Sequence, residues 1–183
     1  MPQYKIYATF DINEALLLDH EFSTQFPWYK HGGYFIRCLE ENREGKRLTI
    51  MDFYGNSLAG CCHLIFNSHY PYFIRNNIPE VNDLNVFQEF RRKKIASKIL
   101  DELERRASKT SKYIGLGVGL YKDYGNAQRM YGKRGYIMDG NGVNYNNVQD
   151  LSRSGLEIQG LRDVPDRFDQ IAGIFRRVMR EVL

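Results

Sequence analysis

The order of apolar and polar residues changes its period several times along the chain. Apolar runs with alternation or β-branched and aromatic enrichment predict strands over residues 4–10, 48–54, 57–66, 78–86 and 113–120. Gly55-Asn56 separates the second run from the third and is a turn signal, which predicts an antiparallel hairpin. Residues 136–139 and 143–145 flank a glycine-rich turn and predict a final hairpin.

Apolar residues at helical spacing predict helices between these strands. Asp11 is a candidate N-cap for a helix through residue 19, and a second helix is expected over about residues 34–43. Residues 93–108 give the clearest case, because apolar positions recur three and four apart among charged ones. A short helix over residues 126–133 is expected to end at Gly135. Residues 70–77 are expected to form a loop.

The last part of the chain differs from the rest in its pattern. We expect one domain over residues 1–150, followed by a segment over residues 151–183. Residues 151–162 are polar and unpatterned, whereas residues 164–183 carry one apolar stripe and predict an amphipathic C-terminal helix. The stripe consists of Phe168, Ile171, Phe175, Val178, Met179 and Val182. Two interpretations remain open, namely packing on the sheet and dimerisation with a second copy.

Composition narrows the class of protein. The 183 residues suffice for one compact α/β domain, and 43% hydrophobic with 26% charged residues is ordinary for a globular protein. No apolar run reaches the roughly 20 residues that span a membrane, and no secretory signal precedes the first strand. Three cysteines, Cys38, Cys61 and Cys62, form a poor disulfide framework and predict a reducing, cytoplasmic location. The four histidines lack metal-ligand spacing, so we expect no metal.

A basic segment lies between a predicted strand and a predicted helix. Arg91, Arg92, Lys93, Lys94 and Lys98 follow the strand over residues 78–86. The first turn of a helix has unpaired backbone N–H groups, and the helix dipole favours an anion there, so this junction suits a pyrophosphate. Taken alone, a basic helix start is more often a solvated face. The net charge of +4 is too small to indicate nucleic acid by itself.

Two motifs in this half of the chain resemble those of the GNAT superfamily of N-acetyltransferases. The acetyl-CoA signature of that family, Q/R-x-x-G-x-G/A, is matched with Arg91 in its first position, Lys94 in its fourth and Ala96 in its sixth. Lys94 thus replaces the first glycine of the signature. Residues 127–136, AQRMYGKRGY, resemble the family's A-x-x-L-Y-x-x-x-G-F segment. Two motifs in the right order are more specific than one.

The resemblance implies a fold, a cofactor and a set of binding residues. The fold would be the GNAT α/β fold, a mixed and mostly antiparallel sheet of six or seven strands flanked by helices. The co-substrate would be acetyl-CoA, held in a cleft between two adjacent parallel strands. The residues implied to bind it are Leu84, Asn85, Val86, Arg91, Arg92, Lys93, Lys94, Ile95, Ala96, Ser97, Tyr124, Ala127 and Tyr131.

The resemblance also implies catalytic roles. Tyr131 holds the position of the family's general acid, and a phenol of pKa near ~10 is protonated at neutral pH. Glu80 matches the strand glutamate that some members use as a base, although Asp83 or water could serve instead. Glu80 and Asp83 lie three residues apart, so they face opposite sides of an ideal strand unless a bulge intervenes. Cys61 and Cys62 have no basic partner in sequence, which argues against a nucleophile.

The function implied is transfer of an acetyl group to a primary amine of a small molecule, peptide or protein. The alternative is a catalytically weak GNAT-like module that binds CoA or a partner. Binding of nucleic acid ranks below both, because the basic run lies where the cofactor should sit. A set of aromatic residues could line an acceptor groove or fill the core, namely Phe26, Trp28, Tyr29, Tyr34, Tyr70, Tyr72 and Phe73. The sequence does not name the amine.

Overall fold

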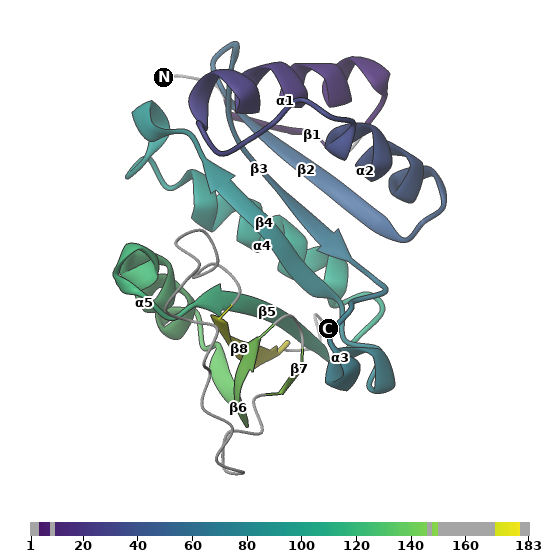
Figure 1. Cartoon of the computed structure of the whole chain (residues 1–183), viewed down its shortest axis with the longest axis vertical. Helices are drawn as coiled ribbons and strands as arrows, with labels where there is room; N and C mark the ends of the chain where they lie inside the picture. Colours follow the sequence, from purple (N-terminus) through teal and green to yellow (C-terminus); the bar gives the residue numbers. More distant parts are fainter. Residues whose placement is uncertain (1–3, 8–9, 146–147, 150–170, 180–183) are drawn as a thin grey trace, which may run out of the picture.

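One mixed sheet of eight strands organises the described part of the chain (Figure 1). The computed structural model describes residues 4–7, 10–145, 148–149 and 171–179. The strands follow the order β1-β2-β3-β4-β5-β8-β6-β7. Their bounds are β1 Tyr4–Tyr7, β2 Arg47–Tyr54, β3 Ser57–Ile65, β4 Glu80–Val86, β5 Tyr113–Gly119, β6 Ile137–Tyr145, β7 Val148–Gln149 and β8 Ile171–Val178. Within these residues only β4 and β5 pair in parallel.

Five α-helices and two 3-10 turns connect the strands. They are α1 Ile12–Gln25, α2 Tyr34–Arg43, α3 Pro71–Arg75, η1 Gln88–Phe90, α4 Ile95–Ala107, η2 Lys122–Tyr124 and α5 Gly125–Lys133. Asp11 is the N-cap of α1, as predicted: its carboxylate accepts the N–H groups of Asn13 and Glu14, while Glu14 accepts the Asp11 N–H. Residues 71–75, expected in a loop, form α3, because Pro71 fits the first turn of a helix.

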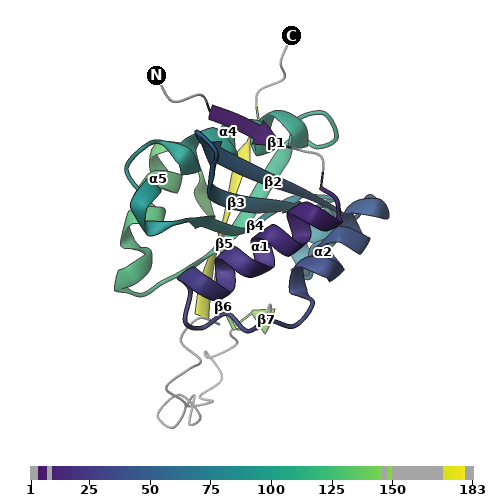
Figure 2. The same cartoon turned by 90° about the horizontal axis from the view of Figure 1, so that it is seen from above.

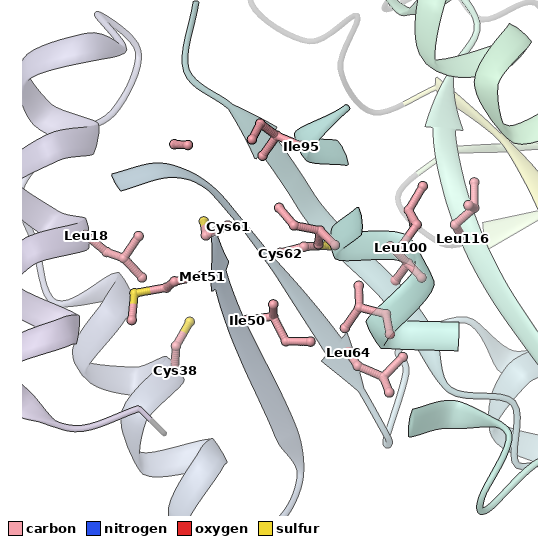
Figure 3. Close-up of a cluster of buried hydrophobic side chains, with 14 of the residues drawn as sticks. Leu18, Cys38, Ile50, Met51, Cys61, Cys62, Leu64, Ile95, Leu100 and Leu116 are labelled. Carbon is pink, nitrogen blue, oxygen red and sulfur yellow. The ribbon is translucent and has the colours of Figure 1, made fainter. Parts of the chain in front are cut away.

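The core lies on both faces of the sheet (Figures 1 and 2). In Figure 3, Cys61 points toward Leu18 of α1 and Met51, whereas Cys62 points toward the side of Leu100 of α4. Neighbouring residues of a strand face opposite sides, so one short run serves two cores. The helices each supply an apolar stripe, which on α4 consists of Ile95, Ile99, Leu100, Leu103 and Ala107.

The C-terminal segment corrects the sequence prediction. Residues 171–178, expected within an amphipathic helix, form strand β8. This strand lies between β5 and β6 and pairs antiparallel with both. Ile174 packs beside Phe73 of α3, whereas Phe175 packs on the main core. The rest of the stripe, at residues 164–170 and 180–183, lies outside the described residues. The segment over residues 171–178 is therefore part of the main sheet.

Two more predictions change in this half of the molecule. Residues 137–145 form one strand with an irregularity between Met138 and Val143, where a hairpin was expected. Both parts of β6 pair with β8, which explains why they do not pair with each other. The sheet therefore has eight strands, where the sequence suggested six or seven. The predicted class, a mixed and mostly antiparallel sheet flanked by helices, is confirmed.

Candidate active site

A cleft opens where β4 and β5 separate. The two strands pair only at Glu80 with Gly115 and Val81 with Leu116, near the start of β4. A cavity of about 320 Å³ lies beyond the end of β4, at the start of α4. Its lining consists of Val86, Phe90, Arg91, Arg92, Lys94, Ile95, Ala96, Ser97 and Met130. Its volume falls within the range of small-molecule sites.

The loop before α4 has an unusual backbone. Arg92 and Lys94 adopt the left-handed region, with φ of 64° and 63°. Lys94 is the N-cap of α4 and makes no side-chain hydrogen bond to the first turn. The N–H groups of residues 95–97 are therefore left for a ligand, and the helix dipole favours an anion there. The arginines beside them can add charge-assisted contacts, so the loop fits a pyrophosphate.

Several of the predicted binding residues lie elsewhere. Lys93 is not part of the cavity lining, and its ammonium lies 4.6 Å from the centre of the Tyr54 ring and 5.1 Å from that of Phe90. The remaining predicted residues outside this cavity lining are Leu84, Asn85, Tyr124, Ala127 and Tyr131. Leu84 and Asn85 belong to β4, whereas the other three belong to η2 and α5. Of the predicted binding residues, the cavity thus brings together Val86 and those of the loop and first turn of α4.

Phe90 and Met130 line the cavity but were not predicted to bind the cofactor. Met130 occupies the leucine position of the A-x-x-L-Y segment, directly before Tyr131. Its place in that motif was therefore a usable signal. Phe90 lies directly before the basic run, and its buried side chain belongs to the main core. No charge pattern could have indicated that role.

A β-bulge in β4 places two acids on one side of the strand. The pairing runs from His63 with Asn82 to Cys61 with Asn85, so Asp83 and Leu84 together oppose one residue of β3. Asp83 adopts a left-handed φ of 51°. The bulge is the exception that was allowed for the expectation that Glu80 and Asp83 face opposite sides.

The two carboxylates are held by different donors. The hydroxyl of Ser68 donates to Glu80 over 2.5 Å, and the hydroxyl of Tyr34 donates to Asp83. Burial raises the pKa of Glu80, and the charge of Asp83 adds to this effect. A carboxylate of raised pKa binds a proton more readily near neutral pH. A raised pKa is the direction that suits a general base.

Tyr131 lies on α5 with only 6% of its surface exposed. Its ring packs against that of Tyr136, with centroids 5.7 Å apart. Burial raises the pKa of Tyr131 above its ordinary value, so the hydroxyl stays protonated at neutral pH. The ring of Tyr124 covers Gly119 at the end of β5, where a Cβ atom would come within 2.7 Å of it. Tyr124 therefore lies against the end of β5.

The aromatic residues considered for an acceptor groove divide between core and surface. Phe26 and Tyr29 pack against the main core, and Phe73 is the buried residue of α3. Trp28, by contrast, is 64% exposed. Cys61 and Cys62 are fully buried, and burial raises the pKa of both thiols, which disfavours a nucleophilic thiolate. Among the described residues, no group of three potential metal ligands occurs.

Comparison with known proteins places the chain in a family. The model of the acetyltransferase (GNAT) family matches residues 11–136, so the chain belongs to the GNAT acetyltransferase family. Members of this family generally depend on acyl-CoA. No curated protein matches this chain. Among the described residues, no helix is long and apolar enough to cross a membrane.

Solved structures share the fold at low sequence identity. A GNAT-family acetyltransferase from Desulfovibrio desulfuricans has 9% identity and a TM-score of 0.69, covering 97% of this chain and 100% of its own. Ard1 from Thermoplasma volcanium has 15% identity and a TM-score of 0.66, covering 97% and 99%. Naa50 from Arabidopsis thaliana, solved with the bisubstrate analogue CoA-Ac-MVNAL, has 15% identity and a TM-score of 0.60, covering 95% and 97%.

Proposed function

We propose that the chain is an N-acetyltransferase that moves an acetyl group from acetyl-CoA to a primary amine within a ternary complex. The observation that carries this proposal is the cavity between β4 and α4, with its basic loop and unpaired helix N–H groups. That loop suits the pyrophosphate of CoA. The loop residues proposed to hold it are Arg91, Arg92, Lys94, Ala96 and Ser97.

The reaction requires a neutral amine, because an ammonium has no lone pair. Glu80 accepts the proton that the amine loses, directly or through a water molecule, and its raised pKa suits this task. The amine nitrogen then forms a bond to the thioester carbon. The backbone N–H of Val86 is proposed to donate to the developing oxyanion. The carbon–sulfur bond breaks as Tyr131 gives its proton to the leaving thiolate, and the Tyr131 phenolate regains a proton from the amide nitrogen, which still carries one in excess.

Replacement of Tyr131 by phenylalanine tests this proposal. The variant keeps the ring but loses the acidic proton, so kcat should fall by about 10²-fold or more, in the range of general acid catalysis. Binding of acetyl-CoA, measured by calorimetry, should remain within about threefold of the parent, because the loop before α4 is unchanged. Turnover is measured as release of free CoA.

The acceptor for that assay comes from a panel of primary amines. Naa50 was solved with an analogue that contains a peptide, so peptides with free N-termini belong in the panel beside polyamines, amino-acid derivatives and aminoglycosides. A Tyr131→Phe variant as active as the parent would show that Tyr131 is not the acid. A parent that binds acetyl-CoA but acetylates no amine would favour the second candidate, a CoA-binding module, which the strained Lys94 position suggests. Three buried free cysteines support a reducing, cytoplasmic location.

A further inference from the structure

Glu104 of α4 is the centre of an ion network that joins several elements. Its carboxylate accepts hydrogen bonds from Arg134, with Nε at 3.0 Å and Nη2 at 2.8 Å. It also accepts the Tyr136 hydroxyl at 3.2 Å and an N–H of Arg177. Only 13% of the Glu104 side chain is exposed. We call these four residues the Glu104 brace.

The Glu104 brace joins elements on the two sides of the short parallel junction between β4 and β5. β4 and β5 share only two paired positions, so backbone bonds alone hold the two sides of the cleft loosely. Glu104 belongs to α4, whose first turn lines the cavity, whereas Arg134 follows α5 and Arg177 belongs to β8. One buried carboxylate thus ties the helix of the anion loop to the elements across the cleft. Charge-assisted bonds in a buried setting are strong and directional.

A direct path leads from the brace to Tyr131. The carbonyl of Tyr131 accepts the N–H of Tyr136 at 3.1 Å and that of Arg134 at 3.0 Å. The rings of Tyr131 and Tyr136 also pack together at 5.7 Å. Tyr136 therefore contacts Tyr131 through its backbone and its ring, and Glu104 through its hydroxyl. A shift of Arg134 or Tyr136 must move Tyr131.

We propose that Glu104 is a positioning residue that fixes the hydroxyl of Tyr131 relative to the anion loop of α4. This inference rests on the proposed function, since it assigns Glu104 a part in the same reaction. Without its charge, Arg134 and Arg177 lose their shared partner, and Arg134 keeps only its ion pair with the exposed Asp101 of α4, over 2.6 Å. The end of α5 is then held less firmly to α4, and Tyr131 shifts from its working position. Small displacements of a catalytic group have large effects on rate.

The first test replaces Glu104 by glutamine, which keeps the volume but removes the charge. We expect kcat to fall about tenfold, with the KM for acetyl-CoA within about twofold of the parent, because the loop before α4 is untouched. Tyr136→Phe, which removes a single hydroxyl, should lower kcat in the same direction by a smaller factor. Glu102→Gln is the matched control, since Glu102 lies on the same helix and accepts bonds from Arg105 and Arg106.

A double variant separates positioning from general destabilisation. If Glu104 acts through Tyr131, Glu104→Gln should lower kcat much less in the Tyr131→Phe background than in the parent. The proposal would be overturned if the fold-decrease in kcat of the double variant equalled the product of the two single fold-decreases. A Glu104→Gln variant with the kcat of the Glu102→Gln control would also overturn it. If the Glu104→Gln protein does not fold, the same double-variant comparison is made with Tyr136→Phe. That variant leaves both guanidinium groups paired with Glu104.

A readout without turnover keeps this inference distinct from the proposed function. With 3-fluorotyrosine at position 131, the fluorine resonance should shift in Glu104→Gln and stay at the parent position in Glu102→Gln. An unchanged resonance in both variants overturns the inference even if the protein is an acetyltransferase. A parent without acetyl transfer to any amine would overturn the proposed function, while the fluorine spectra would still decide whether Glu104 positions Tyr131.

Discussion

Lys94 shows how one residue can keep a family's geometry without the family's glycine. The signature has glycine at this position, and Lys94 here adopts the left-handed φ of 63° that glycine tolerates at no cost. A side chain in that region costs about 1 kcal/mol or more. The sequence identified the substitution but could not tell that the backbone stays left-handed. The loop therefore accepts strain to present its N–H groups.

Asp52 is a second costly residue, and nothing in the sequence singled it out. It lies fully buried in β2, and neither carboxylate oxygen meets the geometry of a full hydrogen bond among the described residues, although the Phe53 amide and the Lys98 ammonium act on it. Burial raises the pKa of Asp52 to about 6, against opposing contributions from the Lys98 ammonium and the Phe53 amide. An alternating strand pattern places an aspartate on a face but does not reveal that a helix covers that face.

This residue predicts a pH dependence of stability. The folded protein binds the Asp52 proton more tightly than the unfolded chain, whose pKa is near ~4. The contribution of Asp52 is therefore fully present below that pH and is lost as the pH rises through about 6. Asp52→Asn should remove the loss and raise the free energy of unfolding at pH 7 by up to about 3 kcal/mol.

Urea unfolding between pH 4 and 7.5 measures this effect. The difference between Asp52→Asn and the parent should grow with pH across that window. Asp123→Asn, a change at an exposed position of η2, serves as the control and should give a constant difference. A parent and an Asp52→Asn variant with parallel pH profiles would show that Asp52 does not titrate in this range.

At the scale of elements, the sequence predicted which segments form strands and helices better than it predicted their partners. The elements before residue 66 and the helices α4 and α5 agree with their apolar patterns. The prediction of a helix over the residues of β8 was wrong because Ile171, Ile174, Phe175 and Val178 also match helical spacing. A strand buried on both faces loses its alternation, so a short apolar run cannot be told from a helix by period alone. The bulge at Asp83 likewise has no signature in the sequence.

The contact of β3 with the bulged β4 yields a prediction at this scale. A Cβ atom on Gly60 would lie 2.6 Å from the Asn85 carbonyl oxygen and 3.3 Å from the Val86 Cα atom. Because these close atoms belong to the backbone and cannot change rotamer as a side chain can, Gly60→Ala should push β4 away from β3. We expect a loss of about 1–3 kcal/mol in the free energy of unfolding and a raised KM for acetyl-CoA, since Val86 lines the cavity.

Gly125→Ala is the matched control for that change. Gly125 has a φ of −56°, and no heavy atom lies within 4 Å of the position its Cβ atom would take. This variant should be neutral or more stable by up to about 1 kcal/mol in the same urea titration. Equal stability of Gly60→Ala and the parent would mean that β3 and β4 can separate without loss.

At the scale of the whole molecule, two motifs were enough to predict the family and the general fold. They could not predict that residues 171–178 complete the sheet, because no local pattern records a pairing between segments so far apart in sequence. The division into residues 1–150 and 151–183 has the same origin. With β8 between β5 and β6, the segment that looked like an appendage joins the two.

This arrangement predicts the outcome of a truncation. A chain that ends at residue 170 lacks β8, so β5 and β6 are left with unpaired edges and Glu104 loses Arg177. We expect this chain to aggregate and to lose a single cooperative unfolding transition. A chain that ends at residue 179 keeps β8 and should retain that transition in circular dichroism. A monomeric 170-residue chain with the midpoint of the full protein would contradict this role of β8.

The position of β8 also bears on how the protein is made. Roughly fifty residues separate Gly119, at the end of β5, from Ile171, at the start of β8. At roughly 5–20 residues per second, a ribosome needs several seconds to add them. During that time the emerging β5 has only β4 beside it, and an exposed apolar strand is what chaperones recognise. The order of strands in the sheet thus sets a waiting period of several seconds during synthesis.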